Sequence, residues 1–98
     1  MSFSLYWTDE ARVTFDSIVR FIEEIWGEKE AGKFIKRTMK VLANIAVQPY
    51  MFKSSGSKAV RKGFISSQTS VFYEIIAKEI HILWFWDNRQ DSFFENLL

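Results

Sequence analysis

The order of hydrophobic and polar positions predicts a short strand and then a helix at the start of the chain. Phe3, Leu5 and Trp7 alternate with two serines and a tyrosine, which is typical of a half-buried β-strand. Thr8 is placed to cap a helix over residues 9–26. In that range apolar residues recur every three or four positions and form one stripe: Ala11, Phe15, Ile18, Ile22 and Ile25.

A second helix is predicted over residues 28–47, separated from the first by Gly27. Pro49 sets its end, because the residue before a proline disfavours helical geometry. A link this short predicts an antiparallel helical hairpin. The apolar stripe of the second helix consists of Ala31, Ile35, Thr38, Leu42 and Ile45. Its polar side carries four basic residues: Lys33, Lys36, Arg37 and Lys40.

Three further strands are predicted at residues 59–65, 70–77 and 80–86. The last two are apolar on both faces, as central strands of a sheet are. We therefore expect residues 1–98 to form a single α+β domain with the element order β-α-α-β-β-β. Its sheet should be antiparallel and should carry the helical hairpin on one face.

The predicted core joins the helical stripes to the inner faces of the strands. Trp84 and Trp86 would share a face with Ile80 and Ile82, which favours core packing over base stacking for both indoles. The residues expected to be buried are Leu5, Phe15, Ile18, Ile22, Ile35, Leu42, Val71, Tyr73, Ile82 and Trp84.

Composition excludes several classes of protein. Of the 98 residues 48% are hydrophobic and 17% aromatic, which is incompatible with a disordered chain. No run of about 18 apolar residues is present, so we expect no transmembrane helix. The chain has no cysteine, which excludes disulfides, thiolate zinc sites and cysteine nucleophiles. The start of the chain lacks the features of a secretory signal, and we expect a cytoplasmic protein.

The net charge of +1 conceals a strong asymmetry along the chain. Residues 31–73 contain eight basic residues and no acidic one, whereas the segments on either side are acidic. This distribution suggests one basic face, which would suit nucleic acid or an acidic protein partner. The solvated side of a helix together with a loop would give the same pattern, and the charge alone does not separate the two interpretations.

Several segments, in this order and spacing, resemble the RelE/ParE superfamily of bacterial type II toxins. The Trp26-Gly27 turn, with Ala31 four residues beyond the glycine, is similar to the ParE branch. The other matching segments are residues 5–11, 45–49, 60–64, 71–75 and 80–91.

The resemblance implies a cytoplasmic toxin that a cognate antitoxin neutralises, with a toxin-antitoxin hetero-oligomer as one form. A ParE-like toxin would inhibit DNA gyrase. A RelE-like toxin would instead be a metal-free endoribonuclease that cuts mRNA on the ribosome, and a third alternative is an inactive relative that only binds the antitoxin. None of these requires a cofactor, a metal ion or a membrane.

The resemblance also points to Arg61, Lys62 and Arg89 as residues that contact the target, with Arg61 and Arg89 catalytic only in a nuclease. Arg61 and Lys62 lie on opposite faces of their strand, so only one of them can meet a given partner. Both arginines also have structural alternatives: Arg61 as a solvated strand residue, and Arg89 as the partner of Asp87 or Asp91 at the strand end. As exposed charges, they should contribute little to stability.

Two departures from the nuclease pattern favour a target-blocking toxin. Ser70 occupies the position where the nuclease branch has an arginine, and the pair Phe93-Phe94 lies where a terminal Tyr or His would be expected. His81 is expected to be a packed or edge residue rather than a general base. Glu74, Asp87 and Asp91 make a poor magnesium site, since they do not cluster. The apolar tail that contains Phe93-Phe94 should dock on the core or on a partner.

Overall fold

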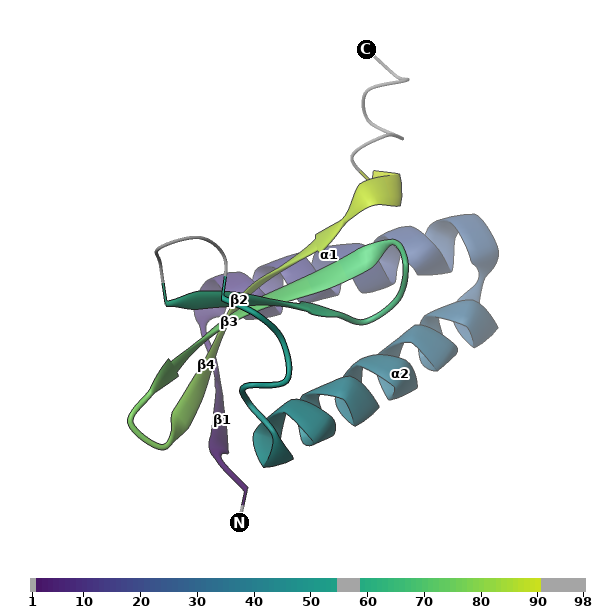
Figure 1. The fold of residues 1–98 in the computed structure, drawn as a ribbon. Helices are drawn as coiled ribbons and strands as arrows, with labels where there is room; N and C mark the ends of the chain where they lie inside the picture. Colours follow the sequence, from purple (N-terminus) through teal and green to yellow (C-terminus); the bar gives the residue numbers. More distant parts are fainter. Residues whose placement is uncertain (1, 55–58, 91–98) are drawn as a thin grey trace.

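The computed structural model describes residues 2–54 and 59–90 and contains all six predicted elements (Figure 1). Both helices have the predicted bounds, and each strand lies within one or two residues of its predicted position. The elements are β1 (Ser4–Trp7), α1 (Asp9–Trp26), α2 (Glu28–Val47), β2 (Val60–Phe64), β3 (Thr69–Ile76) and β4 (Glu79–Asp87). No helix in the described ranges is long and apolar enough to cross a bilayer.

The two ends of α1 have the predicted caps. The Thr8 Oγ1 accepts a hydrogen bond from the Ala11 amide at 3.1 Å, which satisfies one of the free donors of the first turn. The same hydroxyl lies 2.8 Å and 2.9 Å from the carbonyl oxygens of Ile82 and Leu83 on β4. At the other end, Gly27 adopts a φ of 95°, which glycine accommodates without strain, and the chain reverses into α2.

The four strands form one sheet in the order β1-β4-β3-β2, with the helical hairpin on one face (Figure 1). β2, β3 and β4 pair in antiparallel fashion, as predicted, but β1 runs parallel to β4. The expectation of a wholly antiparallel sheet is therefore wrong. A parallel pair needs a long crossover connection, and here the helical hairpin and the next two strands separate β1 from β4 in the chain.

The pairing of β3 with β4 contains a β-bulge at Leu83. The Phe72–Trp84 pair is followed by the Tyr73–Ile82 pair, so Leu83 has no partner of its own. A bulge of this kind inserts one residue into one strand and breaks its regular alternation of faces.

The bulge reverses which residues of β4 face the helices. Ile80 and Ile82 are buried on the helical side, and beyond the bulge the buried side chains are Phe85 and Asp87. Trp84 and Trp86 consequently lie on the opposite face of the sheet, and Trp86 is 47% exposed. The prediction that both indoles belong to the core is wrong, because it assumed regular alternation along β4 and took no account of the extra residue at the bulge.

The core lies between the sheet and the hairpin. Six predicted members are buried there: Ile18, Ile22, Leu42, Val71, Tyr73 and Ile82. Phe15 and Trp84 are only partly buried. Leu5 and Ile35 are each 37% exposed, so their assignment to the core is wrong. Leu5 lies on an edge strand, and on α2 the buried stripe passes through Phe34 in place of Ile35.

Candidate functional site

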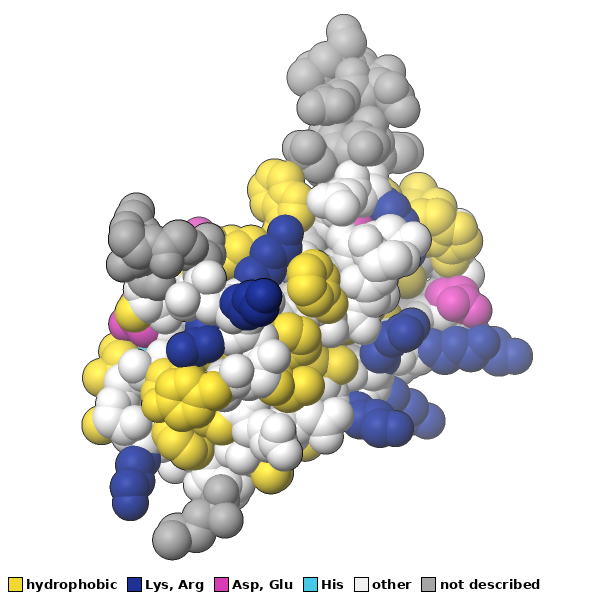
Figure 2. Space-filling view, in the orientation of Figure 1, with side chains coloured by type: hydrophobic (Ala, Val, Ile, Leu, Met, Phe, Trp, Pro, Cys, Tyr) yellow, Lys and Arg dark blue, Asp and Glu magenta, His cyan; other side chains and the backbone are white. Residues whose placement is uncertain are grey.

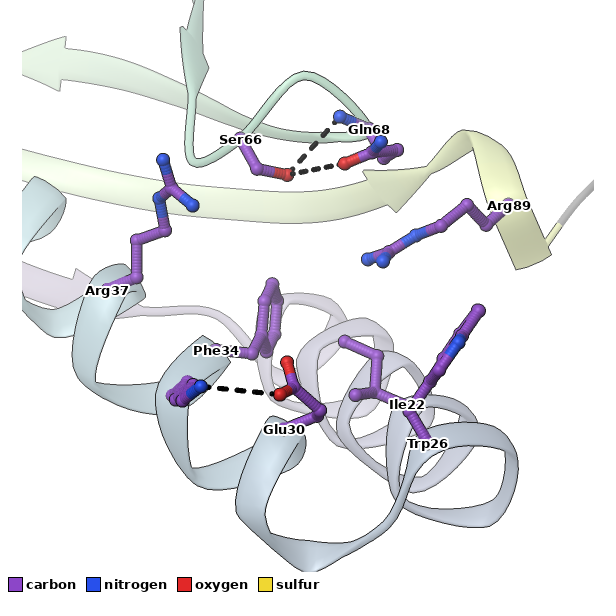
Figure 3. Close-up of a pocket in the computed structure, with 9 residues that line it drawn as sticks. Ile22, Trp26, Glu30, Phe34, Arg37, Ser66, Gln68 and Arg89 are labelled. Carbon is purple, nitrogen blue, oxygen red and sulfur yellow. Dashed lines mark hydrogen bonds and ion pairs between the residues drawn. The ribbon is translucent and has the colours of Figure 1, made fainter.

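A cleft of about 280 Å³ opens where β4 leaves the sheet, between the helical hairpin and the β2–β3 turn (Figure 3). Its floor is apolar and aromatic, and cationic side chains approach from both sides. The lining residues are Ile22, Trp26, Glu30, Lys33, Phe34, Arg37, Ser66, Gln68 and Arg89. Of the predicted site residues, only Arg89 belongs to this cleft.

Arg89 is held by a buried carboxylate. Its Nη2 donates to the Asp87 Oδ2 at 2.9 Å and its Nε to the Asp87 Oδ1 at 3.2 Å. The Arg89 amide and the Thr69 hydroxyl also donate to this carboxylate, whose side chain is fully buried. The guanidinium lies 5.3 Å from the ring centroid of Trp26. Arg89 therefore closes the strand end through Asp87, which is the structural alternative suggested by the sequence.

The electrostatic surroundings of Asp87 keep it ionised. Burial by itself would raise the pKa of this carboxyl, but the hydrogen bonds from Arg89 and Thr69 and the charge of Arg89 together lower it below its ordinary value. The pair therefore carries little net charge toward the cleft, and Arg89 is only partly available to an anionic ligand.

α2 supplies two more cations that sequence reasoning did not single out. Lys33 pairs with Glu30 at 3.4 Å on the exposed surface of the helix. Arg37 extends from α2 toward the β2–β3 turn, on the side of the cleft away from Arg89 (Figure 3). The acid-free stretch 31–73 was the signal for these residues, but charge alone could not show which of its eight cations meet in space.

Arg61 lies far from this cleft and anchors the segment that follows α2. Its Nη1 donates to the carbonyl oxygen of Phe52 at 2.6 Å, and its guanidinium lies 4.9 Å from the ring centroid of Tyr50. The neighbouring Tyr73 is fully buried and donates its hydroxyl to the carbonyl oxygen of Pro49 at 2.7 Å. Burial raises the pKa of Tyr73, against a smaller opposing effect of the Arg61 charge.

Lys62 is exposed on the opposite face of β2. Its Nζ lies 5.6 Å from the ring centroid of Phe64 and 5.9 Å from that of Phe72. Arg61 on β2 pairs with Tyr73 on β3, which in turn pairs with Ile82 on β4. Arg89 follows Asp87, which pairs with Thr69, four residues along β3 from Tyr73 and so about 13 Å away at ~3.3 Å per strand residue. The three predicted site residues therefore do not meet around one phosphate.

The hydrogen bonds of the two arginines also correct the view that they are freely exposed charges. Both guanidinium groups donate to oxygen atoms of their own protein. Replacing either arginine would leave an acceptor unsatisfied, so we expect a cost in stability as well as in any binding role.

The one histidine of the chain is not grouped with these cations. His81 lies toward the β1 side of the sheet, where its Nε2 is 3.4 Å from the Glu79 Oε1 and its ring centroid is 5.1 Å from that of Tyr6. In residues 2–54 and 59–90, no three acidic or histidine side chains cluster as metal ligands would. Asp91 and Phe93-Phe94 lie outside the described residues.

Several solved structures share this fold, and two of them come from toxin-antitoxin systems. A chromosomal ParDE system from P. aeruginosa superimposes with a TM-score of 0.75 at 22% identity, covering 88% of this chain and 96% of that one. The RelBE2 toxin-antitoxin complex from Mycobacterium tuberculosis gives 0.57 at 11% identity, covering 89% and 99%. YafQ from E. coli gives 0.52 at 14% identity, covering 93% and 97%. A search of curated proteins found no significant match.

A comparison with protein families decides between the two branches that the sequence resembles. Residues 5–92 match the family described as the ParE toxin of the type II toxin-antitoxin system parDE. The match extends from β1 through the exit of β4 and includes every element of the fold. The chain therefore belongs to the ParE toxin family of type II toxin-antitoxin systems.

Proposed function

We propose that this ParE-family toxin arrests growth by binding DNA gyrase and blocking it, without cleaving RNA. The observation that carries this proposal is the state of the two arginines a nuclease would use. The Arg61 guanidinium already donates a hydrogen bond to the Phe52 carbonyl oxygen, and the Arg89 guanidinium already donates to the buried Asp87 carboxylate. RNA cleavage needs cations free to stabilise a phosphorane and proton-transfer groups beside them, whereas binding needs neither.

The partner in the resting state is a cognate antitoxin, in a hetero-oligomer with the toxin. Relatives with this fold were solved as toxin-antitoxin systems or complexes, which supports such a partner. The surface also suits one: Figure 2 shows Lys and Arg side chains gathered over α2, with few acidic side chains among them. An acidic antitoxin segment would be steered toward this surface by charge.

Inducing the chain in cells without its antitoxin distinguishes the possible targets. We expect growth arrest with loss of DNA supercoiling, while mRNA in the same culture stays intact. An induced but folded chain that leaves supercoiling unchanged and cuts mRNA would overturn the proposal in favour of a RelE-like ribonuclease. A folded chain that arrests nothing yet binds the antitoxin would identify an inactive relative.

Lys62 offers a cleaner test of target contact than the two arginines. It is exposed and no hydrogen bond links it to the rest of the described protein, so Lys62→Ala should leave stability unchanged to within about 0.5 kcal/mol. Arg61→Ala and Arg89→Ala should weaken growth arrest and also lower the melting temperature.

Growth after induction, melting by circular dichroism and the amount of soluble protein should be measured for all three variants. Lys29→Ala, on the exposed first turn of α2, is the charge-matched control. If all three variants remain as toxic as the parent chain, Arg61, Lys62 and Arg89 do not contact the target.

A further inference from the structure

The face of the sheet that points away from the helices carries an array of aromatic rings around one lysine. Two rows of cross-strand neighbours build it. Lys62, Phe72 and Trp84 are in register across β2, β3 and β4, and so are Phe64, Ser70 and Trp86. We call the following side chains the aromatic array: Lys62, Phe64, Phe72, Trp84 and Trp86.

Two rings of the array are stacked against each other, and two others are exposed to solvent. The rings of Phe72 and Trp84 stack with centroids 4.8 Å apart and planes 22° apart. Phe64 and Trp86 flank the small Ser70 and remain 55% and 47% exposed. The Trp86 Nε1 donates to the Asn88 Oδ1 at 3.1 Å, which fixes the indole. Two large rings thus stand exposed on a paired strand surface.

The charge of the array is positive. Lys62 has its ammonium near two of the rings, and none of the other members carries a charge. The nearest acidic residue of β3 is Glu74, two positions beyond Phe72 and on the side away from Phe64 and Trp86. Figure 2 shows the same arrangement on a larger scale, with Lys and Arg side chains among hydrophobic ones over the sheet.

We propose that the aromatic array binds single-stranded nucleic acid without cleaving it. Bases would stack on the exposed rings of Phe64 and Trp86, and Lys62 would contact a backbone phosphate. Aromatic rings on an open sheet, next to a cation, are the elements with which proteins hold unpaired bases irrespective of sequence. A duplex would not fit, because its bases are already stacked on one another. This activity does not depend on which macromolecule the toxin blocks.

The test measures binding of the full chain to a fluorescein-labelled oligo-dT of about 12 nucleotides by fluorescence anisotropy. Trp86→Ala and Phe64→Ala should each weaken binding by about fivefold or more, the loss expected for one stacked base. Trp86→Leu keeps apolar volume without the aromatic face, so it should weaken binding as well. An unlabelled duplex of the same sequence should compete poorly.

Salt dependence isolates the role of Lys62. Between about 50 and 200 mM salt, Lys62→Ala should reduce the slope of log K against log salt by about 0.7 for the lost phosphate contact. Lys78→Ala, at the β3–β4 turn, removes the same charge elsewhere and should not change that slope. Tyr6→Ala removes an exposed aromatic ring at the far edge of the sheet and should leave affinity unchanged.

Three results would overturn the proposal, provided that each variant melts like the parent chain. The first is no binding of oligo-dT by the parent chain at the lowest salt concentration. The second is an equal reduction of the salt slope in Lys62→Ala and Lys78→Ala, which would mean that the oligonucleotide is held only by diffuse electrostatic attraction. The third is unchanged oligonucleotide binding by Trp86→Ala and Trp86→Leu with weaker binding of the antitoxin or gyrase, which would make the array a protein-docking surface.

Discussion

Replacing Asp87 with asparagine should destabilise the fold by about 3 kcal/mol, the lower end of the cost of removing one partner of a buried ion pair. The lower end applies because the Arg89 side chain is 31% exposed and water can partly solvate it once the carboxylate is gone. An amide would also accept fewer of the hydrogen bonds that Thr69 and Arg89 now donate. Denaturant unfolding monitored by circular dichroism measures the difference in the free energy of unfolding.

Asp16→Asn is the matched control for this substitution. Asp16 pairs with Arg20 at 3.2 Å, but both side chains are largely exposed. An exposed pair of this kind contributes at most about 0.5 kcal/mol. Equal losses of stability in the two variants would show that Asp87 is not the buried centre of the strand end.

The same carboxylate predicts how stability depends on pH. The pKa of Asp87 is lower in the folded protein than in the unfolded chain, so on acidification the unfolded chain takes up the proton first. The stabilisation is complete above the ordinary pKa of about 4 and is lost as the pH falls through the lower folded value. Stability measured from neutral pH downward should decline more steeply for the parent chain than for Asp87→Asn.

Leu42→Ala should cost about 2–5 kcal/mol, because it removes a fully buried side chain between the hairpin and the sheet. Such a loss is a large share of the ~5–15 kcal/mol that stabilises a typical domain. Ile35→Ala, on the same helix, should cost much less, since Ile35 is partly exposed to solvent. Thermal unfolding of both variants tests the register of α2. A larger effect of Ile35→Ala would place the wrong face of the helix on the core.

Local signals were enough to predict the helices. Thr8, Gly27 and Pro49 set their ends through backbone geometry and hydrogen bonding that involve only neighbouring residues. The choice between Phe34 and Ile35 for the buried stripe depended on how α2 is rotated against the sheet. That rotation is a property of tertiary packing, so periodicity located the stripe only to within one residue.

Long-range pairing limited what the sequence could predict about the sheet and the site. The parallel register of β1 with β4 joins the two ends of the chain, and the bulge at Leu83 is defined only by how β4 pairs with β3. The Arg89–Asp87 pair could be suggested, because both residues lie on one short segment. The approach of Arg37 to the same cleft could not, because nothing in the sequence relates α2 to the β2–β3 turn.

The extra residue in β4 has a consequence for how this protein can change in evolution. Deleting Leu83 would remove the bulge, and Ile82, Trp84 and Phe85 would then alternate regularly on the faces that they already occupy. Phe85 and Asp87 would still face the helices, whereas losing one residue from the regular part of the strand would exchange them with Trp84 and Trp86. Leu83 is therefore the position at which β4 can lose one residue and keep its other side chains on their present faces. Natural variation in the length of this segment should accordingly occur at Leu83 or in the turns on either side of the strand.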